Sequence, residues 1–279
     1  MLNEMKLGSA DWNLWPLGMK YETTFPIFNK LGIGFVELGI YTPSAELTEQ
    51  NLEEISRLEK AHGVQVTAAL FSLTPERWPQ GAFSNTKSGF LEECEIFFSA
   101  LKTARIKYAN IWTGADLPDA NLEETLLTLK KLDALASKYD GVVSIEYKAD
   151  TIFPNGADLA EMLKPFNFLK VLIDTGHAFA LEENVVELIK DLHSRKLMGA
   201  MHLGDAIAGD SDADLPCGRV HDFSPILKVL DEIKFSASAN FDLYGAAVDE
   251  DGPGPESILE ESTTYLKSLL GTNYRKSVV

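Results

Sequence analysis

The chain has 279 residues with 42 acidic and 25 basic side chains, which gives a formal net charge of −17. Such an acidic surface repels phosphate backbones, so nucleic acid is not the expected main partner, although local charge still permits a small anionic substrate. Hydrophobic residues make up 45 % of the chain and there are only two cysteines, as expected for a globular protein of the reducing cytoplasm. No apolar run suits a signal peptide or a membrane helix, so we expect no membrane partner.

Eight short apolar runs follow one another along the chain and are typical of β-strands. They cover residues 6–10, 34–39, 64–71, 108–113, 142–147, 169–174, 197–203 and 235–243. Amphipathic segments separate many of them. In residues 48–63, for example, Leu52, Ile55 and Leu58 recur at helical spacing, and Gly63 is a typical C-terminal stop.

Strand and helix patterns alternate about eight times, at intervals of roughly 30 residues, which is typical of a (β/α)8 TIM barrel. An open doubly wound sheet is the alternative α/β architecture, but no GxGxxG motif follows an early strand. No low-complexity linker divides the chain, so we expect a single domain over residues 1–279. The longer loops, 71–88 and 204–220, leave C-terminal strand ends, where barrel enzymes hold their active sites.

Four late strands end with a side chain that can bind a metal. Glu146, Asp174 and His202 lie at the ends of their runs, and the eighth run carries Asn240 and Asp242. The carboxyl ends of barrel strands surround one mouth, so these groups are expected to converge. Carboxylate oxygens with one imidazole nitrogen suit Mn²⁺, Mg²⁺, Co²⁺ or Zn²⁺. The sequence therefore predicts a site for one divalent metal ion.

Each of these residues also has an ordinary structural interpretation. Asp174 could cap the helix that follows it, Glu146 could pair with Lys148, and His202 could be a hydrogen-bonded interior histidine. What favours the metal site is the joint pattern, with one ligand type at each of four successive strand ends.

The eighth strand offers two candidates for the fourth ligand. Asn240 and Asp242 share the same parity, so both side chains point to the same face of the strand. Asp242 is preferred because a carboxylate binds a cation better than an amide does. Asn240 or a water would take the position if the Asp242 side chain did not reach it.

The order of these segments resembles the xylose isomerase-like barrels, also called the sugar phosphate isomerase/epimerase family. The similar stretches are "GFVELGI" around Glu37, "SIEYK", "VLIDTGHA", "MHLGD", "LPCGRVHDF" and finally "DLYG", where relatives usually carry glutamate. The most specific of them is "DTGHA". The resemblance covers nearly the whole chain.

The resemblance implies roles for individual residues. Glu146, Asp174, His202 and Asp242 match the family's metal ligands, and His177 matches a histidine that lies near the substrate in several members. Two departures concern the sugar epimerases. No arginine follows the seventh-strand histidine in "HLGDAIAGD", and "EYKADTIFPN" offers a lysine and an aspartate in place of their acidic partner after the fifth-strand glutamate.

The expected function is that of a divalent-metal-dependent isomerase or epimerase of a small carbohydrate or keto-sugar, acting through an enediolate intermediate. Glu146 would act as the base, Asp242 from the opposite face, and His177 would bind a substrate oxygen or pass a proton. Two alternatives remain open, an inosose-dehydratase-like lyase and a non-catalytic barrel with an altered metal site. A phosphodiester hydrolase is disfavoured, because the enzymes of this kind that resemble the chain use several zinc ions and many more histidines than the five present here.

Further side chains are candidate substrate contacts at the barrel mouth. They are Lys148, His177, His221, Trp15, Trp112 and Glu37. Lys148 and His221 could instead be surface residues, and the two tryptophans could form an apolar wall for a sugar ring or pack in the core. The sequence leaves the substrate's identity open, and a homo-oligomer is compatible with it.

Overall fold

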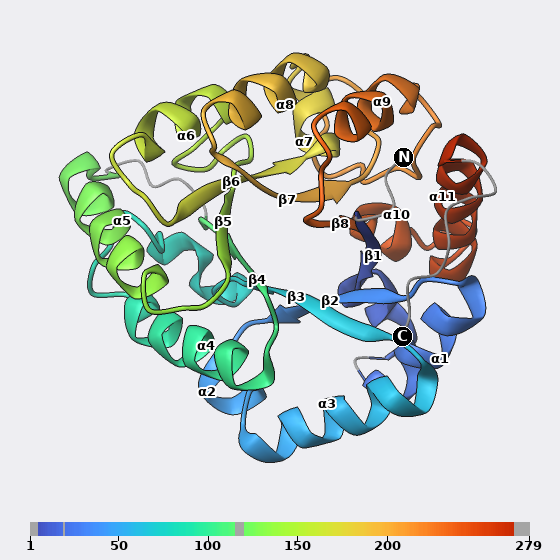
Figure 1. Ribbon diagram of the computed structural model, residues 1–279, viewed down its shortest axis with the longest axis horizontal. Coiled ribbons are helices and arrows are strands. Elements are labelled where there is room, and N and C mark those ends of the chain that lie inside the picture. Colours follow the sequence, from blue (N-terminus) through green and yellow to red (C-terminus); the bar gives the residue numbers. More distant parts are fainter. Residues whose placement is uncertain (1–4, 19, 115–119, 271–279) are drawn as a thin grey trace.

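A closed barrel of eight parallel strands forms the centre of the molecule (Figure 1). The computed structural model describes residues 5–18, 20–114 and 120–270. The strands follow chain order around the barrel, and β8 pairs with β1 to close it. They are β1 Lys6–Ala10, β2 Phe35–Ile40, β3 Gln65–Phe71, β4 Tyr108–Trp112, β5 Val142–Glu146, β6 Leu169–Asp174, β7 Met198–Leu203 and β8 Ser238–Phe241. The predicted single-domain TIM barrel is confirmed.

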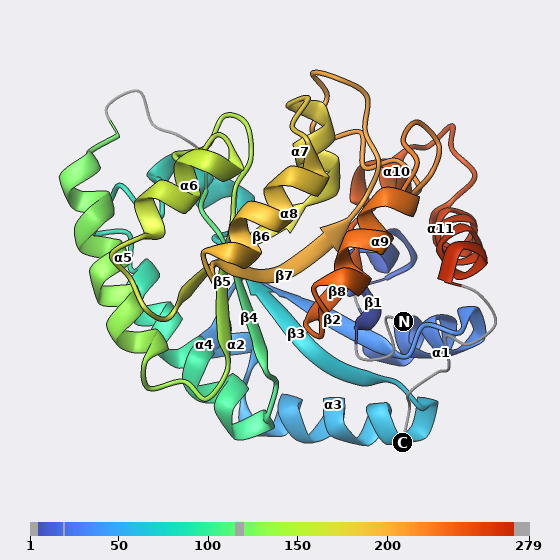
Figure 2. The ribbon, with the colours of Figure 1, turned by 45° about the horizontal axis from the view of Figure 1, so that its top comes forward.

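Helices cover the outside of the barrel (Figures 1 and 2). The α-helices are α1 Tyr21–Leu31, α2 Pro43–Glu46, α3 Glu49–His62, α4 Phe90–Ala104, α5 Leu122–Ala136, α6 Gly156–Leu163, α7 Thr175–Ala180, α8 Val185–Ser194, α9 Ser224–Glu232, α10 Tyr244–Val248 and α11 Pro255–Leu270, and two 3-10 helices are η1 Asp11–Leu17 and η2 Pro75–Gln80. Among the described residues, no helix is both long enough and apolar enough to cross a bilayer.

Local signals account for both ends of α3. Helix α3 begins at Thr48, whose side chain accepts a hydrogen bond from the Asn51 N–H, and it ends at Gly63 with a φ of 62°. Glycine has no Cβ atom and adopts this left-handed conformation without a steric penalty, which is why glycine ends so many helices. The helix predicted from the spacing of Leu52, Ile55 and Leu58 therefore lies where expected.

Strand β8 is shorter than the predicted run of residues 235–243. Phe235 belongs to the turn that ends α9, because its N–H donates to the Leu230 carbonyl and the preceding Lys234 has a φ of 54°. At the other end, the Leu243 N–H donates to the Asn13 side chain, not to a neighbouring strand. Asp242 therefore lies just beyond the strand, at the barrel mouth.

Strand β1 approaches its neighbours closely at Gly8. A Cβ atom at this position would lie 2.6 Å from the Phe35 carbonyl oxygen and would also meet the side-chain oxygen of Asn240. We expect Gly8→Ala to lower the free energy of unfolding by about 1–3 kcal/mol, the usual cost of overpacking a core. Urea unfolding measures this. A variant as stable as the wild type would show that β1 can move away from β2 and β8 at little cost.

Candidate metal centre

Four side chains from four neighbouring strand ends converge at the barrel mouth. Glu146 ends β5, Asp174 ends β6, His202 lies near the end of β7 and Asp242 follows β8. Each offers one ligand atom, and the four atoms all lie within 4.8 Å of one another. The Nδ1 atom of His202 lies 3.3 Å from Glu146 Oε1 and 3.4 Å from Asp242 Oδ2. It lies 3.7 Å from Asp174 Oδ2.

The other nitrogen of His202 faces away from this cluster, toward Glu37. Its Nε2 lies 3.1 Å from Glu37 Oε2, and an ionised carboxylate can only accept, so Nε2–H is the donor. Glu37 also accepts from the amides of Asn240, at 2.6 Å, and Asn110, at 2.7 Å. In the neutral imidazole, the lone pair of Nδ1 then points at the three carboxylates, which is the orientation that a metal-binding histidine needs.

The structure places two of the predicted site residues beneath the cluster. Glu37, expected to contact substrate, is completely buried and lies beneath His202, outside the described lining of the pocket. Asn240, the substitute for Asp242, also lies beneath the cluster, where its amide nitrogen donates to Glu37 and to the Ser238 hydroxyl. Asp242, the preferred candidate, is the member of the pair that reaches the cluster.

Asp174 uses its two oxygens for different purposes. Oδ1 accepts a hydrogen bond of 2.9 Å from the His177 N–H and so caps the N-terminus of α7. Oδ2 is the oxygen that faces His202. The capping interpretation of Asp174 and its place in the ligand cluster are therefore compatible, because each occupies its own oxygen.

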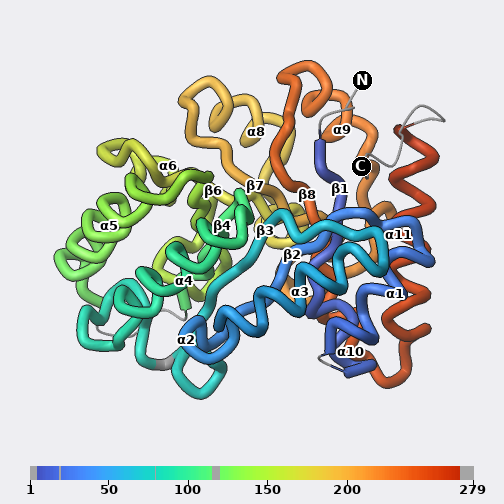
Figure 3. Tube along the Cα trace, turned by 60° about the horizontal axis from the view of Figure 1, so that its bottom comes forward, coloured from blue at the N-terminus to red at the C-terminus, as the bar shows by residue number. Residues whose placement is uncertain are grey.

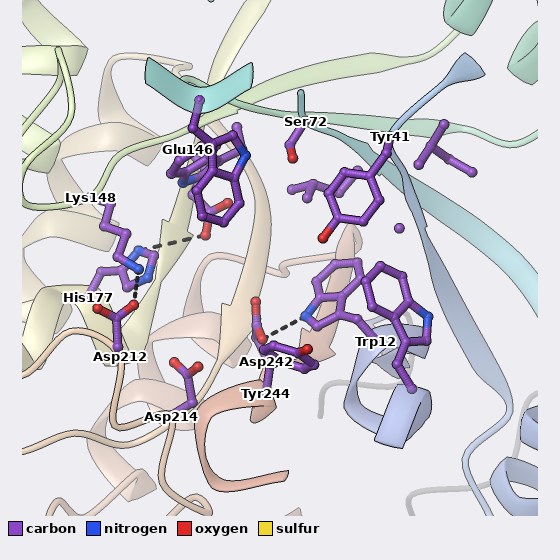
Figure 4. Close-up of a pocket in the computed structure, with 16 residues that line it drawn as sticks. Trp12, Tyr41, Ser72, Glu146, Lys148, His177, Asp212, Asp214, Asp242 and Tyr244 are labelled. Atoms are coloured by element: carbon purple, nitrogen blue, oxygen red, sulfur yellow. Dashed lines mark hydrogen bonds and ion pairs between the residues drawn. The ribbon is translucent and has the colours of Figure 1, made fainter. Parts of the chain in front are cut away.

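The two oxygens of Asp242 also have different partners. Its Oδ1 accepts a 2.8 Å hydrogen bond from the indole N–H of Trp12, which leaves Oδ2 facing His202 (Figure 4). Trp12 lies in η1, directly after β1, and its ring packs edge-on against the His202 imidazole. The Asp242 N–H also donates to the Leu203 carbonyl of β7, so the indole hydrogen bond orients the side chain of a residue whose backbone is already held.

The charges of the cluster are strongly coupled. Burial alone would lower the pKa of His202, but Glu37 and Glu146 raise it well above its usual value. Burial alone would raise the pKa of Glu146, but His202 lowers it. Burial raises the pKa of Asp242 to about 6, with His202 opposing and Asp174 adding to the shift. One imidazole thus has to compensate several carboxylates.

The donor set fits a divalent cation. Three carboxylates and a histidine lie within 4.8 Å, three of the four residues are buried, and together they carry more negative charge than one imidazolium can offset. Like charges held this close and this deep are costly unless a cation lies between them. Oxygen ligands with a single imidazole suit Mn²⁺, Co²⁺, Zn²⁺ or Mg²⁺.

A pocket of about 230 Å³ opens above the cluster (Figure 4). Six aromatic residues line it, namely Trp12, Trp15, Tyr41, Trp78, Trp112 and Tyr244. Trp15 lies 5.6 Å from Tyr41, and Trp78 lies 4.8 Å from Trp112, both measured between ring centroids. Trp15 and Trp112 were expected at the barrel mouth, and both line the pocket.

Polar groups line the rest of the pocket. Lys148 forms an ion pair with Asp212, which comes from the long loop after β7. His177 approaches Glu146 at 3.7 Å, and its Nδ1 contacts the Tyr147 carbonyl at 3.0 Å. A carbonyl only accepts, so Nδ1 carries a hydrogen and the remaining nitrogen, Nε2, is the one left for a ligand.

His221 lies outside the described lining of this pocket. Its ring stacks on Phe179 with 3.9 Å between centroids, and its Nδ1 lies 2.7 Å from Asp205 Oδ1. The Asp205 carboxylate also accepts from the backbone N–H groups of Val220 and His221. Of the two alternatives for His221, the geometry favours the loop histidine, which anchors the loop after β7 through Asp205.

The model of the family described as xylose isomerase-like TIM barrels matches residues 25–269. The chain belongs to this family. The sequence has no match among the curated proteins.

Several solved structures share the architecture of this xylose isomerase-like barrel. A D-tagatose 3-epimerase-like protein has a TM-score of 0.77 at 15 % identity, over 95 % of this chain and 97 % of that one. The 3-keto-D-glucoside 4-epimerase of E. coli, in its apo form, has a TM-score of 0.74 at 17 % identity, over 95 % and 99 %. The IOLI protein with a binding zinc atom has a TM-score of 0.73 at 17 % identity, over 98 % and 100 %. At these identities the likeness establishes the fold.

Several residues of the barrel mouth were not predicted by the sequence analysis, and Trp12 and Asp214 are two of them. Trp12 holds Asp242, and its position directly after the first strand was the available signal. Asp214 lies in the loop after β7, lines the pocket and accepts from the Gly245 N–H. Burial raises its pKa to about 8, and Asp242 and Asp174 add to the shift. A loop residue of this kind gives no periodic signal, so only the folded chain reveals it.

Proposed function

We propose that this xylose isomerase-like barrel is a divalent-metal-dependent isomerase or epimerase of a small carbohydrate. The observation that carries the proposal is the convergence of four ligand atoms within 4.8 Å at the base of an aromatic-lined pocket. The solved sugar epimerases that share the fold, and the zinc-containing IOLI structure, are consistent with it.

Glu146, Asp174, His202 and Asp242 would hold the metal ion. When bound, the ion would act as a Lewis acid that stabilises negative charge on a substrate oxygen beside the carbon that loses its proton. Glu37 would keep the Nε2–H of His202 occupied, so that Nδ1 stays available as a ligand.

Glu146 and Asp242 are the proposed proton carriers. Both carboxylates line the pocket, so both can reach a bound substrate. Glu146 would take a proton from the carbon next to the carbonyl, and Asp242 would return one from the other side for epimerisation. Return of the proton to the neighbouring carbon would give isomerisation.

His177 and Lys148 are proposed to orient the substrate. The Nδ1–H of His177 is held by the Tyr147 carbonyl, so Nε2 can accept a hydrogen bond from a sugar hydroxyl. Lys148 is fixed by its ion pair with Asp212 and can donate to a substrate oxygen from the pocket wall. The tryptophans would contact the apolar C–H face of the ring.

Deuterium exchange tests this function. With Mn²⁺ present and D₂O as solvent, the wild type is expected to incorporate deuterium next to the carbonyl of at least one ketose or inosose, as followed by NMR. Glu146→Gln keeps an oxygen ligand but removes the base, so exchange is expected to fall on the order of 100-fold or more. The exposed Glu123→Gln is the matched control and should exchange at the wild-type rate.

Two results would contradict the proposal. One is the absence of exchange across the sugar panel by protein that has bound its metal. The other is undiminished exchange in Glu146→Gln. Loss of water with formation of a conjugated product would assign the barrel to the lyases, which share the first proton abstraction.

A further inference from the structure

The pocket above the metal ligands carries an excess of negative charge. Its described lining holds four carboxylates, Glu146, Asp212, Asp214 and Asp242, against one lysine, Lys148. Lys148 is already paired with Asp212, and Glu146 and Asp242 belong to the ligand cluster. Asp214 is the carboxylate of this lining that is neither paired with the lysine nor part of the cluster.

Asp214 is held through one of its two oxygens. Oδ2 accepts a 2.8 Å hydrogen bond from the Gly245 N–H in α10, and the side chain has no other hydrogen bond and no ion pair with the described residues. Figure 4 shows the carboxylate pointing toward the space between His177 and Asp242. Its second oxygen, Oδ1, is therefore left for a ligand of the pocket.

The chain fixes this carboxylate firmly. Asp214 has a φ of 39°, which non-glycine residues rarely adopt and which is often found at functional sites. The next residue, Leu215, exchanges two backbone hydrogen bonds with Asp205. A Cβ atom at Gly245 would overlap the Asp212 carbonyl, so glycine is what lets the loop lie against α10. Helix α10 in turn packs against η1, and Figure 3 shows it beside the N-terminal part of the chain.

A second acceptor lies in the same part of the pocket. The His177 side chain is only 8 % exposed and lines the pocket, and its Nδ1–H is directed to the Tyr147 carbonyl. Its Nε2 therefore has a lone pair and no partner among the described residues. His177 and Asp214 are near enough for their charges to interact. A protonated amine has three N–H donors and can serve both acceptors, whereas a hydroxyl can donate to only one of them.

The other surroundings of Asp214 favour the same charge. Six aromatic rings line the pocket, and the face of a tryptophan or tyrosine ring attracts a cation. Burial and the neighbouring carboxylates raise the pKa of Asp214 to about 8. An opposite charge beside a carboxyl group lowers its pKa, so an ammonium group stabilises the ionised form that binds it. A phosphate would instead meet carboxylates and a lysine that is already paired.

We propose that the substrate is an amino sugar, a carbonyl sugar of one ring whose protonated amino group lies on a carbon away from the carbonyl and contacts Asp214. This inference rests on the proposed carbohydrate function and adds the charge of the substrate to it. The carbonyl end reacts at Glu146 and Asp242, and the amino group only fixes the ring in place. The pocket volume of about 230 Å³, below the usual range of about 300–1,000 Å³ for ligand sites, suits a single ring.

Sugars that differ only in the charge of one substituent test the proposal. Titration calorimetry of the Mn²⁺-loaded protein at neutral pH compares 3-amino-3-deoxy-D-glucose and 6-amino-6-deoxy-D-glucose with D-glucose and D-glucose 6-phosphate. At least one of the two amines is expected to bind about tenfold more tightly than D-glucose, because it gains a close charge pair. The phosphate is expected to bind about tenfold more weakly than D-glucose, because like charges meet. The measurement needs no turnover.

Variants of the loop after β7 assign the effect to residues. Asp214→Asn keeps an oxygen for the Gly245 N–H but removes the charge, so the preference for the amine over D-glucose should fall about tenfold. Asp212→Asn leaves Lys148 without its counter-ion and should narrow the gap between the amine and the phosphate by a similar factor. Glu260→Gln, exposed on α11, removes one negative charge elsewhere and is the matched control, with the wild-type order of affinities.

Two outcomes would overturn the inference. In one, neither amine binds more tightly than D-glucose. In the other, Asp214→Asn prefers the amine as strongly as the wild type does. Both are independent of catalysis. Deuterium exchange with a neutral sugar, without any preference for amines, would remove this inference and keep the proposed function. Amine binding that depends on Asp214, without exchange in any sugar, would contradict the proposed function and leave the ammonium site standing.

Discussion

Asp174→Asn is expected to weaken Mn²⁺ or Zn²⁺ binding on the order of 100-fold or more, because loss of a partner that only supports a ligand already costs about 10–100-fold. Asparagine has the same shape, and its oxygen would stay on the His177 N–H, where Oδ1 of Asp174 now accepts. Its NH₂ group would then occupy the place of Oδ2, which faces His202. Two N–H donors would point at the cation site, where a ligand needs a lone pair. Isothermal titration calorimetry with each metal measures the change.

The same variant separates metal binding from folding. Because the cap of α7 is kept and one of the mutually repelling carboxylates is removed, the unfolding free energy of the metal-free protein should fall by no more than about 1 kcal/mol, the typical cost of losing a cap. Asp191→Asn, on the surface of α8, is the matched control and should leave metal affinity unchanged. Metal affinity of Asp174→Asn within threefold of the wild type would remove Asp174 from the ligand set.

Glu37→Leu is expected to lower both stability and metal affinity. The carboxylate of Glu37 accepts from His202, Asn240 and Asn110, all of which are buried. Leucine would remove the acceptor of these three buried groups, of which Asn240 still donates to the Ser238 hydroxyl, and a buried donor left without an acceptor costs about 1–3 kcal/mol. We therefore expect a loss of several kcal/mol in urea unfolding of the metal-free protein. We also expect metal affinity to fall at least tenfold, since His202 loses the contact that orients its ring.

Glu37→Gln is the informative companion. Its oxygen can still accept from His202 and Asn240. Its NH₂ can bond the Asn110 side chain if that amide turns over, because Asn110 Oδ1 has no hydrogen-bond partner among the described residues. Stability should therefore fall less than in Glu37→Leu. If the two variants were equally stable and bound metal equally well, the hydrogen bonds beneath His202 would not be what holds the centre in place.

The eighth strand shows how far the sequence could be followed. The alternation of side chains along a strand placed Asn240 and Asp242 on the same face, but it does not say how high along the barrel axis each side chain lies. Residues along a strand rise about 3.3 Å each, so the two side chains differ in height by about 7 Å. In the barrel, Asn240 is the register partner of His202, whereas Asp242 lies beyond the strand end. The closure of the barrel therefore decided which of them joins the cluster of Glu146, Asp174 and His202.

The positions of Glu37 and Asp214 could not be predicted from the sequence either. Glu37 lies on β2, where the register with β3 shifts between Val36 and Glu37, and it meets His202 only because the barrel closes. Asp214 reaches the pocket from an irregular loop. Contacts between residues that are distant in the chain depend on strand register and loop path, and neither is a local property.

By itself the sequence determined the barrel, its eight strands in order and the ligand types at four strand ends. These follow from hydrophobic periodicity, which acts over a few residues, and from the rule that parallel strands end at a common edge. Tertiary structure decided the rest: which oxygen of Asp174 caps and which faces His202, that Trp12 holds Asp242, and that Glu37 supports His202 from below. The physical reason is that a side chain's partner is set by three-dimensional distance, which only the folded chain fixes.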